Sequence, residues 1–497
     1  MKSFFNKNWL LLILIVLAIF TRFWQLDKPS EVVFDEVHFG KFVSAYFNHE
    51  YYFDIHPPLG KLMIAGTAKF LGFNSGFDFK QIGEALNAKD LFALRFLPAF
   101  FGVIFVIVIY QLLLALNLSR LGAFAGAFLV IFENAILVES RFILVDIFLL
   151  TFGFSGIYTF LLFRKSNGKS RLFYLLLTGV LLGLAFSIKS TGISFLGLAL
   201  LFTFVDSLYK FELKKFNFGS LLFSLKNYVI NFEYKKFILT SLGLIIISVA
   251  VYASTFPMHF AQLYNSGPGD AYMSAGFQKT LVGNKVSADN TERPLNYWGK
   301  FIELNKAMFN YNSGLTATHP DGSKWYEWPL MKKPIYYWVK SGDGVTSNIY
   351  LVGNPLVWWL GTFSVLLALL SLLLKKIRQK LTPEIYFLIA GYVINLLPFI
   401  LISRVAFLYH YLTALVFSIL ILVFMAEKLL FNNQLKIMDE EIEKQNFKNH
   451  KRFFTIYFIC LSLVFISFLV LSPLTYGLPT SSEQAKSYSS FIGSLHN

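Results

Sequence analysis

Cysteine is almost absent from this sequence: its 497 residues include only one, Cys460, inside an apolar run. A disulfide framework within the chain and a cysteine metal site are therefore excluded. The sequence also lacks an internal repeat and a low-complexity segment. The first apolar stretch, from about Trp9 to Phe20, is not followed by a small-residue cleavage site. We therefore expect it to remain as a first transmembrane helix rather than to be removed as a signal peptide.

Long hydrophobic runs are abundant. Hydrophobic residues make up 56% of the chain, and several runs exceed the roughly 18 residues that a membrane-spanning helix needs. We therefore predict an all-α polytopic membrane protein with about eleven transmembrane helices and two large outer loops. The expected spans lie at approximately 8–25, 93–116, 121–138, 142–163, 172–188, 191–209, 238–256, 351–374, 384–402, 405–426 and 453–472. The loops divide the chain into an N-terminal module at 1–256 (with the first loop at 26–92), a second loop at 257–350 and a C-terminal module at 351–497.

The net charge of +15, from 44 basic and 29 acidic residues, is concentrated in loops between spans. Lysine and arginine cluster at 164–171, 210–236 and 375–380, and with eleven spans these loops share the side of the N-terminus. Basic loops mark the cytoplasmic side. We therefore predict a cytoplasmic N-terminus, with both long loops and the C-terminus facing outward. This placement makes the charge a signal for topology and anionic lipid rather than for nucleic acid.

Two acidic motifs lie in the first outer loop. Asp35 and Glu36 stand in FDEVHFGKF, and Asp54 stands in YYFDIHPPLGKL, two residues before His56. Carboxylates at the mouth of a helical bundle suit an enzyme whose substrate is reached from the bilayer. Each also has a structural interpretation: Asp35 as the cap of the helix-compatible stretch 37–47, and Asp54 as the cap of the turn that His56, Pro57 and Pro58 enforce.

Further ionisable residues fall at the outer ends of the expected helices. They are Arg95, Glu133, Glu139, Arg141, Asp146, Lys189, Arg404 and His410. Charges at membrane depth cost about 2.5–3.5 kcal/mol each on insertion scales, so they usually mark function or an internal pair. One interpretation is an outward cavity that holds an anionic headgroup through arginine and lysine. The alternatives are snorkelling to outer headgroups for Arg95, Lys189 and Arg404, and an ion pair of Arg141 with Asp146 or Glu139.

Several segments together resemble one enzyme family. FDEVHFGKF, YYFDIHPPLGKL, LRFLPAFFG, ENAILVESRFILVD, IKSTG and RVAFLYHYL, and the outer segment from Asn296 to Trp338, follow one another in family order between about residues 30 and 415. They are similar to blocks of the protein O-mannosyltransferases, glycosyltransferase family 39 of the GT-C superfamily. The resemblance implies a GT-C fold and the transfer of mannose from a polyprenyl phosphate to serine or threonine of an exported polypeptide, with inversion at C1.

The resemblance also implies roles for individual residues. The catalytic base maps to Asp35, with Glu36 beside it, and the second acidic motif maps to Asp54. Substrate contacts are expected from further residues of the shared blocks: Arg95, His56, Glu133, Arg141, Lys189, Arg404 and His410. The lipid-linked mannose is a co-substrate; no further cofactor is expected, and the scattered histidines give no compact metal-ligand motif.

The second outer loop departs from part of the family. Fungal and animal members insert a β-trefoil (MIR) domain there, and this loop of about 94 residues (257–350) is too short to hold one as well as the family segment. This departure implies a prokaryotic enzyme of the plasma membrane. The expected partners are the lipid-linked donor, the exported polypeptide, membrane lipids and the protein-export machinery.

Two other functions remain open from the sequence. A related GT-C transferase would move the sugar to a lipid or a cell-wall glycan. A transporter or flippase would line an ion path with polar residues near the membrane midplane on inverted repeats. The polar residues here gather at one face and no repeat is visible, which favours a transferase.

Overall fold

The computed structural model describes residues 2–74, 76–208, 233–288, 293–342, 344–374, 378, 382–431, 434–443 and 451–496. Among these residues, nine helices are long and apolar enough to cross a membrane, and shorter apolar helices cover Asn8–Phe23 and Arg120–Ile131. Each expected span therefore contains a long or a shorter apolar helix, and the predicted multi-pass α-helical fold is confirmed. Of the basic residues used to predict the orientation, Lys210, Lys214, Lys215, Lys226, Lys375, Lys376 and Lys380 lie outside the described residues.

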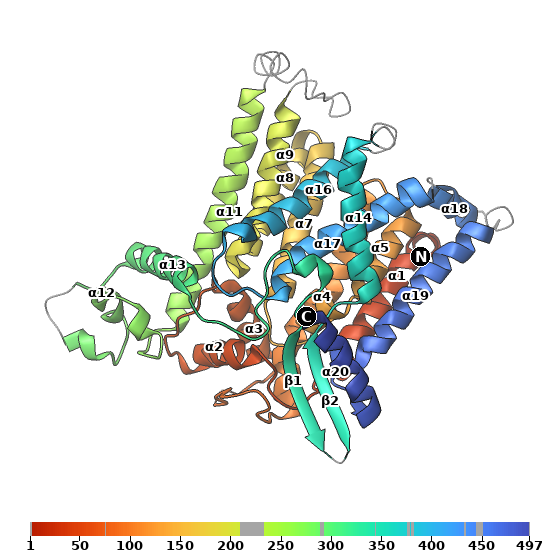
Figure 1. The fold of residues 1–497 in the computed structure, drawn as a ribbon. Helices are drawn as coiled ribbons and strands as arrows, with labels where there is room; N and C mark the ends of the chain where they lie inside the picture. Colours follow the sequence, from red (N-terminus) through yellow and green to blue (C-terminus); the bar gives the residue numbers. More distant parts are fainter. Residues whose placement is uncertain are drawn as a thin grey trace.

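The N-terminal half contains the first acidic loop and most of the bundle. Its helices are α1 (Lys2–Phe23), α2 (Glu36–Asn48), α3 (Leu59–Phe70), α4 (Ala88–Ala115), α5 (Arg120–Ile131), α6 (Asn134–Glu139), α7 (Asp146–Lys165), α8 (Gly168–Ile188), α9 (Ile193–Ser207) and α11 (Tyr234–Gln262). Side-chain caps start α4 and α5, as one also starts α6: Asn87 accepts a hydrogen bond from the Asp90 amide, and Ser119 accepts one from the Gly122 amide. The short α2 and α3 lie in the first outer loop, at one end of the bundle (Figure 1).

The predicted span 121–138 is interrupted in the structure. α5 ends at Ile131, and α6 begins at Asn134, directly after its N-cap residue Glu133. Glu133 Oε2 accepts a hydrogen bond from the Ile136 amide at 2.7 Å, which satisfies a donor that a helix start leaves free. An acidic cap inside an apolar run thus divides one expected helix into two short ones.

The C-terminal half contains the second outer loop and the remaining spans. Its elements are α12 (Ala275–Gln278), α13 (Tyr297–Gly314), β1 (Ile335–Gly342), β2 (Val345–Leu351), α14 (Pro355–Leu373), α16 (Glu384–Leu396), α17 (Leu412–Met425), α18 (Gln434–Glu443), α19 (Lys451–Tyr476), β3 (Pro479–Ser481) and α20 (Ser482–His496). The span containing α17 and that formed by α7 are each 78% buried, whereas those of α11 and α19 are 28% buried. The core of the bundle therefore lies around α7 and α17, and α11 and α19 lie at its periphery.

A small antiparallel sheet, in the order β1-β2-β3, was not anticipated from the sequence. Ile335 pairs with Leu351 at the start of the β1-β2 hairpin, and Val345 pairs with Ser481 of β3. The sheet and α20 lie at the same end of the bundle as α2 and α3 (Figure 1). Strand β1 contacts the first acidic motif, because the Phe34 amide donates to the Tyr337 carbonyl at 3.1 Å and the two rings stack at 4.4 Å.

Candidate functional site

Asp35 has a carboxylate with no partner among the residues that the structure describes. It occupies the N-cap position of α2, but its side chain makes no capping hydrogen bond, and no hydrogen bond or ion pair to it occurs within the described parts of the chain. Burial raises the pKa of Asp35 to about 6; His38 and Lys189 oppose this shift, and Asp146 and Asp54 add to it. The structure therefore does not support the capping interpretation, and it leaves Asp35 available to accept a proton near neutral pH.

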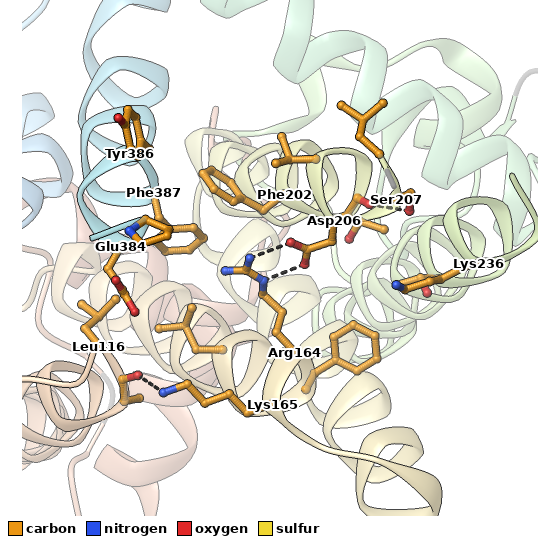
Figure 2. A pocket seen from close by; sticks show the side chains of 18 of the residues that line it. Leu116, Arg164, Lys165, Phe202, Asp206, Ser207, Lys236, Glu384, Tyr386 and Phe387 are labelled. Atoms are coloured by element: carbon orange, nitrogen blue, oxygen red, sulfur yellow. Dashed lines mark hydrogen bonds and ion pairs between the residues drawn. The ribbon is translucent and has the colours of Figure 1, made fainter. Parts of the chain in front are cut away.

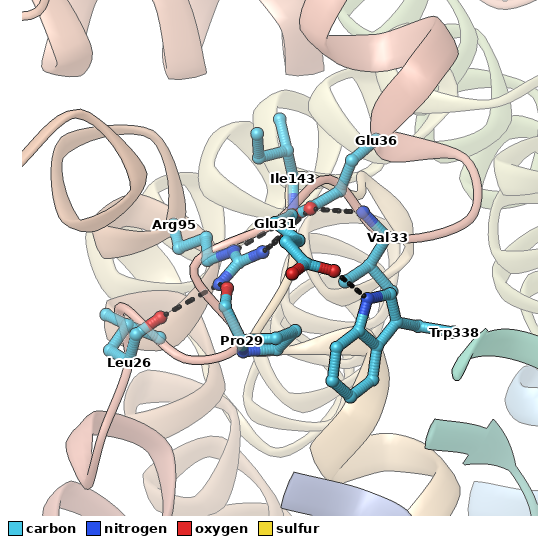
Figure 3. A network of polar contacts seen from close by, with 8 residues as sticks. All are labelled: Leu26, Pro29, Glu31, Val33, Glu36, Arg95, Ile143 and Trp338. Atoms are coloured by element: carbon cyan, nitrogen blue, oxygen red, sulfur yellow. Dashed lines mark hydrogen bonds and ion pairs between the residues drawn. The ribbon is translucent and has the colours of Figure 1, made fainter. Parts of the chain in front are cut away.

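Glu36 has the opposite environment, although it is the next residue. Its fully buried carboxylate accepts hydrogen bonds from Arg95 Nε and a terminal guanidinium nitrogen, both at 2.8 Å. The amides of Val33 and Ile143 donate two more, at 2.9 and 3.0 Å. Figure 3 shows the guanidinium of Arg95 facing this carboxylate, with the carbonyls of Leu26 and Pro29 on its other side. Every acceptor position of Glu36 is thus engaged in holding the loop.

Arg95 has no capacity left for a substrate phosphate in this arrangement. Besides Glu36, it donates to three backbone carbonyls, those of Leu26, Pro29 and Glu31, and its side chain is fully buried. The pair joins α4 to the first acidic motif. The resemblance placed Glu36 beside the catalytic base and made Arg95 a substrate contact. In the structure the two side chains instead bind each other and hold the loop segment next to Asp35.

Asp54 forms an ion pair that the sequence analysis did not include. Lys61, at the start of α3, donates to the Asp54 carboxylate and to the His56 carbonyl, the latter at 2.9 Å. The exposed fractions of the two side chains are only 2% for Lys61 and 9% for Asp54. The Lys61 ammonium also lies 5.7 Å from the centre of the Phe42 ring. The turn through Pro57 therefore closes around a buried charge pair.

His56 lies among positive charges. Its ring stacks parallel to Phe39 at 6.5 Å. Burial, together with the charges of Lys189, Lys61 and Arg404, lowers the pKa of His56 well below its usual range. The imidazole is therefore neutral and can act as a hydrogen-bond donor or acceptor, but not as a further cation.

Lys189 connects several segments at the outer ends of the helices. It lies between α8 and a short 3-10 turn (Ser190–Gly192), and its ammonium is 2.6 Å from the carboxylate of Asp146, the first residue of α7. The Tyr409 ring faces the same ammonium at 5.0 Å. This contact brings the late RVAFLYHYL segment against the N-terminal half. An oriented, largely buried ammonium in this position suits a phosphate oxygen.

Arg404 lines a cavity of about 740 Å³ together with Trp325 and Trp328 of the second outer loop. Among the described residues, no carboxylate pairs with its half-buried guanidinium. The His410 ring stacks on Trp328 at 5.9 Å, and the Phe407 amide donates to its Nδ1 at 3.1 Å. Arg404 is therefore a cation available to an anionic ligand, and His410 supports the aromatic wall beside it.

Glu133 and Arg141 make structural contacts between segments of the bundle instead. Beyond capping α6, Glu133 accepts a hydrogen bond from the Asn354 amide at 2.8 Å, at the start of α14. Arg141 donates to four carbonyls between Thr21 and Gln25 and lies over the Tyr476 ring at 4.6 Å. Neither ion pair considered for Arg141 occurs in the described structure, because Asp146 pairs with Lys189 and Glu139 bonds Tyr337.

The structure thus separates the expected site residues into two groups. Asp35, Asp54, His56, Lys189, Arg404 and His410 act on one another electrostatically at one end of the bundle, as the charges felt by Asp35 and His56 indicate. Glu36, Arg95, Glu133 and Arg141 are buried in structural contacts.

The sequence analysis did not single out Lys61, Tyr337 or Tyr409, and it named Asp146 and Glu139 only as ionisable residues at the outer helix ends. Lys61 stands in the same motif as Asp54 and was detectable there. The Tyr337 hydroxyl donates to Glu139 at 2.5 Å across 198 residues of sequence, a contact that no local pattern indicates. Among the described residues, no group of three His, Cys, Asp or Glu side chains forms a metal site.

Comparison with known sequences identifies matches along most of the chain. The family model described as dolichyl-phosphate-mannose-protein mannosyltransferase matches residues 12–264, and a model described as the C-terminal four-transmembrane region of protein O-mannosyltransferase matches 297–492. Protein O-mannosyltransferase 1 of Drosophila melanogaster is 36% identical over 355 residues, 70% of this chain and 37% of the relative. Dolichyl-phosphate-mannose–protein mannosyltransferase 3 of Saccharomyces cerevisiae is 36% identical over 279 residues, 55% of this chain and 36% of the relative. The matched regions thus cover little more than a third of these relatives.

Solved structures match over nearly the whole chain. The S. cerevisiae protein O-mannosyltransferase Pmt1-Pmt2 complex bound to the sugar donor has a TM-score of 0.80 at 20% identity, covering 97% of this chain and 91% of that one. The Archaeoglobus fulgidus oligosaccharyltransferase AglB has a TM-score of 0.55 at 15% identity, covering 98% and 60%. These likenesses confirm the expected GT-C fold.

Proposed function

Because the chain belongs to the dolichyl-phosphate-mannose-protein mannosyltransferase family, we propose that it transfers mannose from a polyprenyl phosphate to serine or threonine of an exported polypeptide. The observation that carries this proposal is the Asp35 carboxylate, which has no partner among the described residues and lies within electrostatic range of the Lys189 ammonium. A base and a cation in one place are what sugar transfer from a lipid phosphate to a hydroxyl requires.

Asp35 is the proposed base. Its carboxylate takes the proton of the acceptor hydroxyl while that oxygen forms a bond to C1 of mannose. The bond between C1 and the phosphate oxygen breaks, and the electron pair leaves with the lipid phosphate. One displacement inverts C1, so a β-linked donor gives an α-linked product and no sugar–enzyme bond forms.

Lys189 and Arg404 are the proposed ligands of the departing phosphate. Its negative charge grows as the C1–O bond breaks, and fixed cations stabilise that charge most strongly in a site with little water. The neutral His56 and His410 can supply hydrogen bonds without adding charge. The Asp54–Lys61 pair holds the turn that carries His56.

The remaining expectations belong to the same proposal. The N-terminal module (1–256) and the C-terminal module (351–497) both contribute to the site, and the loop at 257–350 supplies its aromatic wall through Trp325 and Trp328. We place the site and the C-terminus on the outer face of a plasma membrane, where exported chains pass. The protein-export machinery is therefore a proposed neighbour.

The alternative acceptor is a lipid or a cell-wall glycan, which would use the same donor and the same base. Purified protein, polyprenyl-phosphate-mannose and candidate exported peptides, analysed by mass spectrometry, test the protein acceptor directly. A hexose on serine or threonine is the expected product. In membranes given radiolabelled donor, label in protease-sensitive material supports the proposal, whereas label only in lipid or glycan would overturn it.

A further inference from the structure

A second cavity lies at the other end of α7 from the candidate site. It has a volume of about 760 Å³ and is bordered by the last turns of α7 and α9 and the first turns of α11 and α16 (Figure 2). α7 has 20 residues between Asp146, which pairs with Lys189, and Lys165, which lines this cavity. At about 1.5 Å per residue the two ends are roughly 30 Å apart, the thickness of a bilayer's hydrocarbon core. The cavity therefore lies at the opposite membrane surface.

The ionisable lining is mainly basic. Four cations line the cavity with two carboxylates: Arg164, Lys165, Arg171 and Lys236 with Asp206 and Glu384. Both carboxylates already have partners. Asp206 accepts two parallel hydrogen bonds from Arg164, at 2.6 and 2.7 Å, as Figure 2 shows, and Glu384 accepts one from Asn117 at 2.9 Å.

None of the other three cations forms an ion pair with a lining carboxylate among the described residues, and Glu384 acts on Lys165 only as a nearby charge. Arg171 is held over the Phe163 ring at 4.3 Å, and no carboxylate pairs with it in the described part of the chain. Lys165 donates to the Ala115 carbonyl at the end of α4, at 2.5 Å. In the described part of the chain, Lys236 pairs with Glu233, which lies outside the lining, and both side chains are more than 40% exposed, so that pair is weak.

Apolar side chains form the rest of the wall. Leu161, Phe202, Leu208 and Phe387 line the cavity between the cations. A soluble anion would gain nothing from this apolar surface. A lipid can use both parts at once, with its phosphate on the cations and its glycerol and upper acyl chain on the wall.

We propose that this cavity binds the headgroup of a negatively charged lipid, with Arg171 and Lys165 as ligands of the phosphate. The guanidinium of Arg171 is already oriented by Phe163, so less side-chain entropy is lost when it binds. The ligand chemistry is a lipid phosphate with net negative charge, which either a bilayer phospholipid or a polyprenyl phosphate presents. Occupancy of this cavity does not depend on the proposed sugar transfer.

Native mass spectrometry of the detergent-purified full chain tests the site. Phosphatidylglycerol, phosphatidylcholine and polyprenyl phosphate are titrated separately. Arg171→Gln removes the unpaired charge at an exposed helix start and leaves the ion pair of Arg164 intact. Loss of a charge-assisted hydrogen bond should weaken binding of the anionic lipid about ten-fold or more, and Arg171→Lys should recover part of the loss.

Lys169→Gln provides the matched control, because Lys169 is exposed two residues away and does not line the cavity. It should leave lipid binding unchanged. An effect of Arg171→Gln on phosphatidylglycerol identifies a bilayer phospholipid as the source, and an effect confined to polyprenyl phosphate identifies the carrier. Equal binding of phosphatidylcholine and phosphatidylglycerol, or an Arg171→Gln variant that binds both anionic lipids as well as the parent, would overturn the proposal.

Discussion

Asp35 and Glu36 are adjacent in the chain but differ in their partners. The Glu36 carboxylate accepts four hydrogen bonds, two of them from Arg95, whereas that of Asp35 accepts none from the described residues. The buried Glu36–Arg95 pair fixes the start of α2. Asp35 directly precedes this start, and its carboxylate is bound by none of the described residues. Substitution of Asp35 is therefore expected to affect activity, and substitution of Glu36 to affect stability.

Asp35→Asn should remove activity and leave stability nearly unchanged. The variant keeps the shape of the side chain, and no hydrogen bond of the described structure is lost. General-base catalysis contributes about 10²–10⁴-fold, so the single-turnover rate should fall by at least the lower figure while donor binding persists. Rates measured with lipid-linked mannose and peptide, beside thermal unfolding in detergent, check this. An Asp35→Asn protein with normal turnover would end the proposed mechanism.

Glu36→Gln is the matched control for that experiment, with the reverse pattern. It leaves the guanidinium of Arg95 buried without its counter-charge, and breaking a buried ion pair in this way typically costs about 3–5 kcal/mol. Unfolding should therefore occur at a clearly lower temperature. The protein that remains folded should turn over far faster than the Asp35→Asn variant.

The sequence predicted the spans and the acidic motifs, because hydrophobic length and local motifs are properties of short segments. The local motif does not distinguish Asp35 from Glu36, and only the family resemblance assigned the base to Asp35, since the difference in their partners arises from Arg95, 59 residues from Glu36. The pairing of Lys189 with Asp146, 43 residues apart, has the same origin. The sheet was missed because β1 and β2 lie in a loop whose aromatic residues are also typical of membrane interfaces.

Asp54 and Lys61 should show strong coupling in a double-mutant cycle. Asp54→Asn leaves a buried ammonium unpaired, and Lys61→Gln leaves a buried carboxylate unpaired. Each single change should be destabilising, but the double variant should lose less than the sum, by about 0.5–3 kcal/mol of interaction free energy. Thermal unfolding of the four proteins gives the cycle. Additive losses would mean that the pair contributes little to the turn around His56.

Arg404→Gln should weaken binding of the donor and leave binding of the acceptor nearly unchanged. Its guanidinium has no carboxylate partner among the described residues, so no ion pair of the fold is broken. Loss of a charge-assisted hydrogen bond to phosphate costs about 1.5–3 kcal/mol, which should raise the KM for lipid-linked mannose by about ten-fold or more while that for peptide hardly changes. Lys69→Gln, on the exposed end of α3, is the control. A main effect on expression or melting temperature would make Arg404 structural.

Orientation can be tested with single cysteines. Ser170, at the basic end of α8, should lie in the cytoplasm, and Ser266, in the second large loop, should lie outside. Since the native Cys460 is exposed, Cys460→Ala provides the background for Ser170→Cys and Ser266→Cys. A membrane-impermeant maleimide should label the second variant in intact cells and the first only after the membrane is opened. Labelling of both from one face would contradict the proposed side of the site.

The pH dependence of transfer should report Asp35. Its pKa is raised by burial to about 6, and a base acts only in its deprotonated form. Activity should therefore be fully present above about pH 7, be halved near pH 6, and fall about ten-fold for each further unit of acidification.

The rate of a single turnover with saturating donor and peptide, measured between pH 5 and 8, gives the profile. Donor binding measured over the same pH range separates loss of the base from loss of the enzyme–donor complex. A rate that is constant down to pH 5, with Asp35→Asn still inactive, would place the working pKa of this carboxyl well below 6 and imply that bound substrate brings it a hydrogen-bond donor or a positive charge.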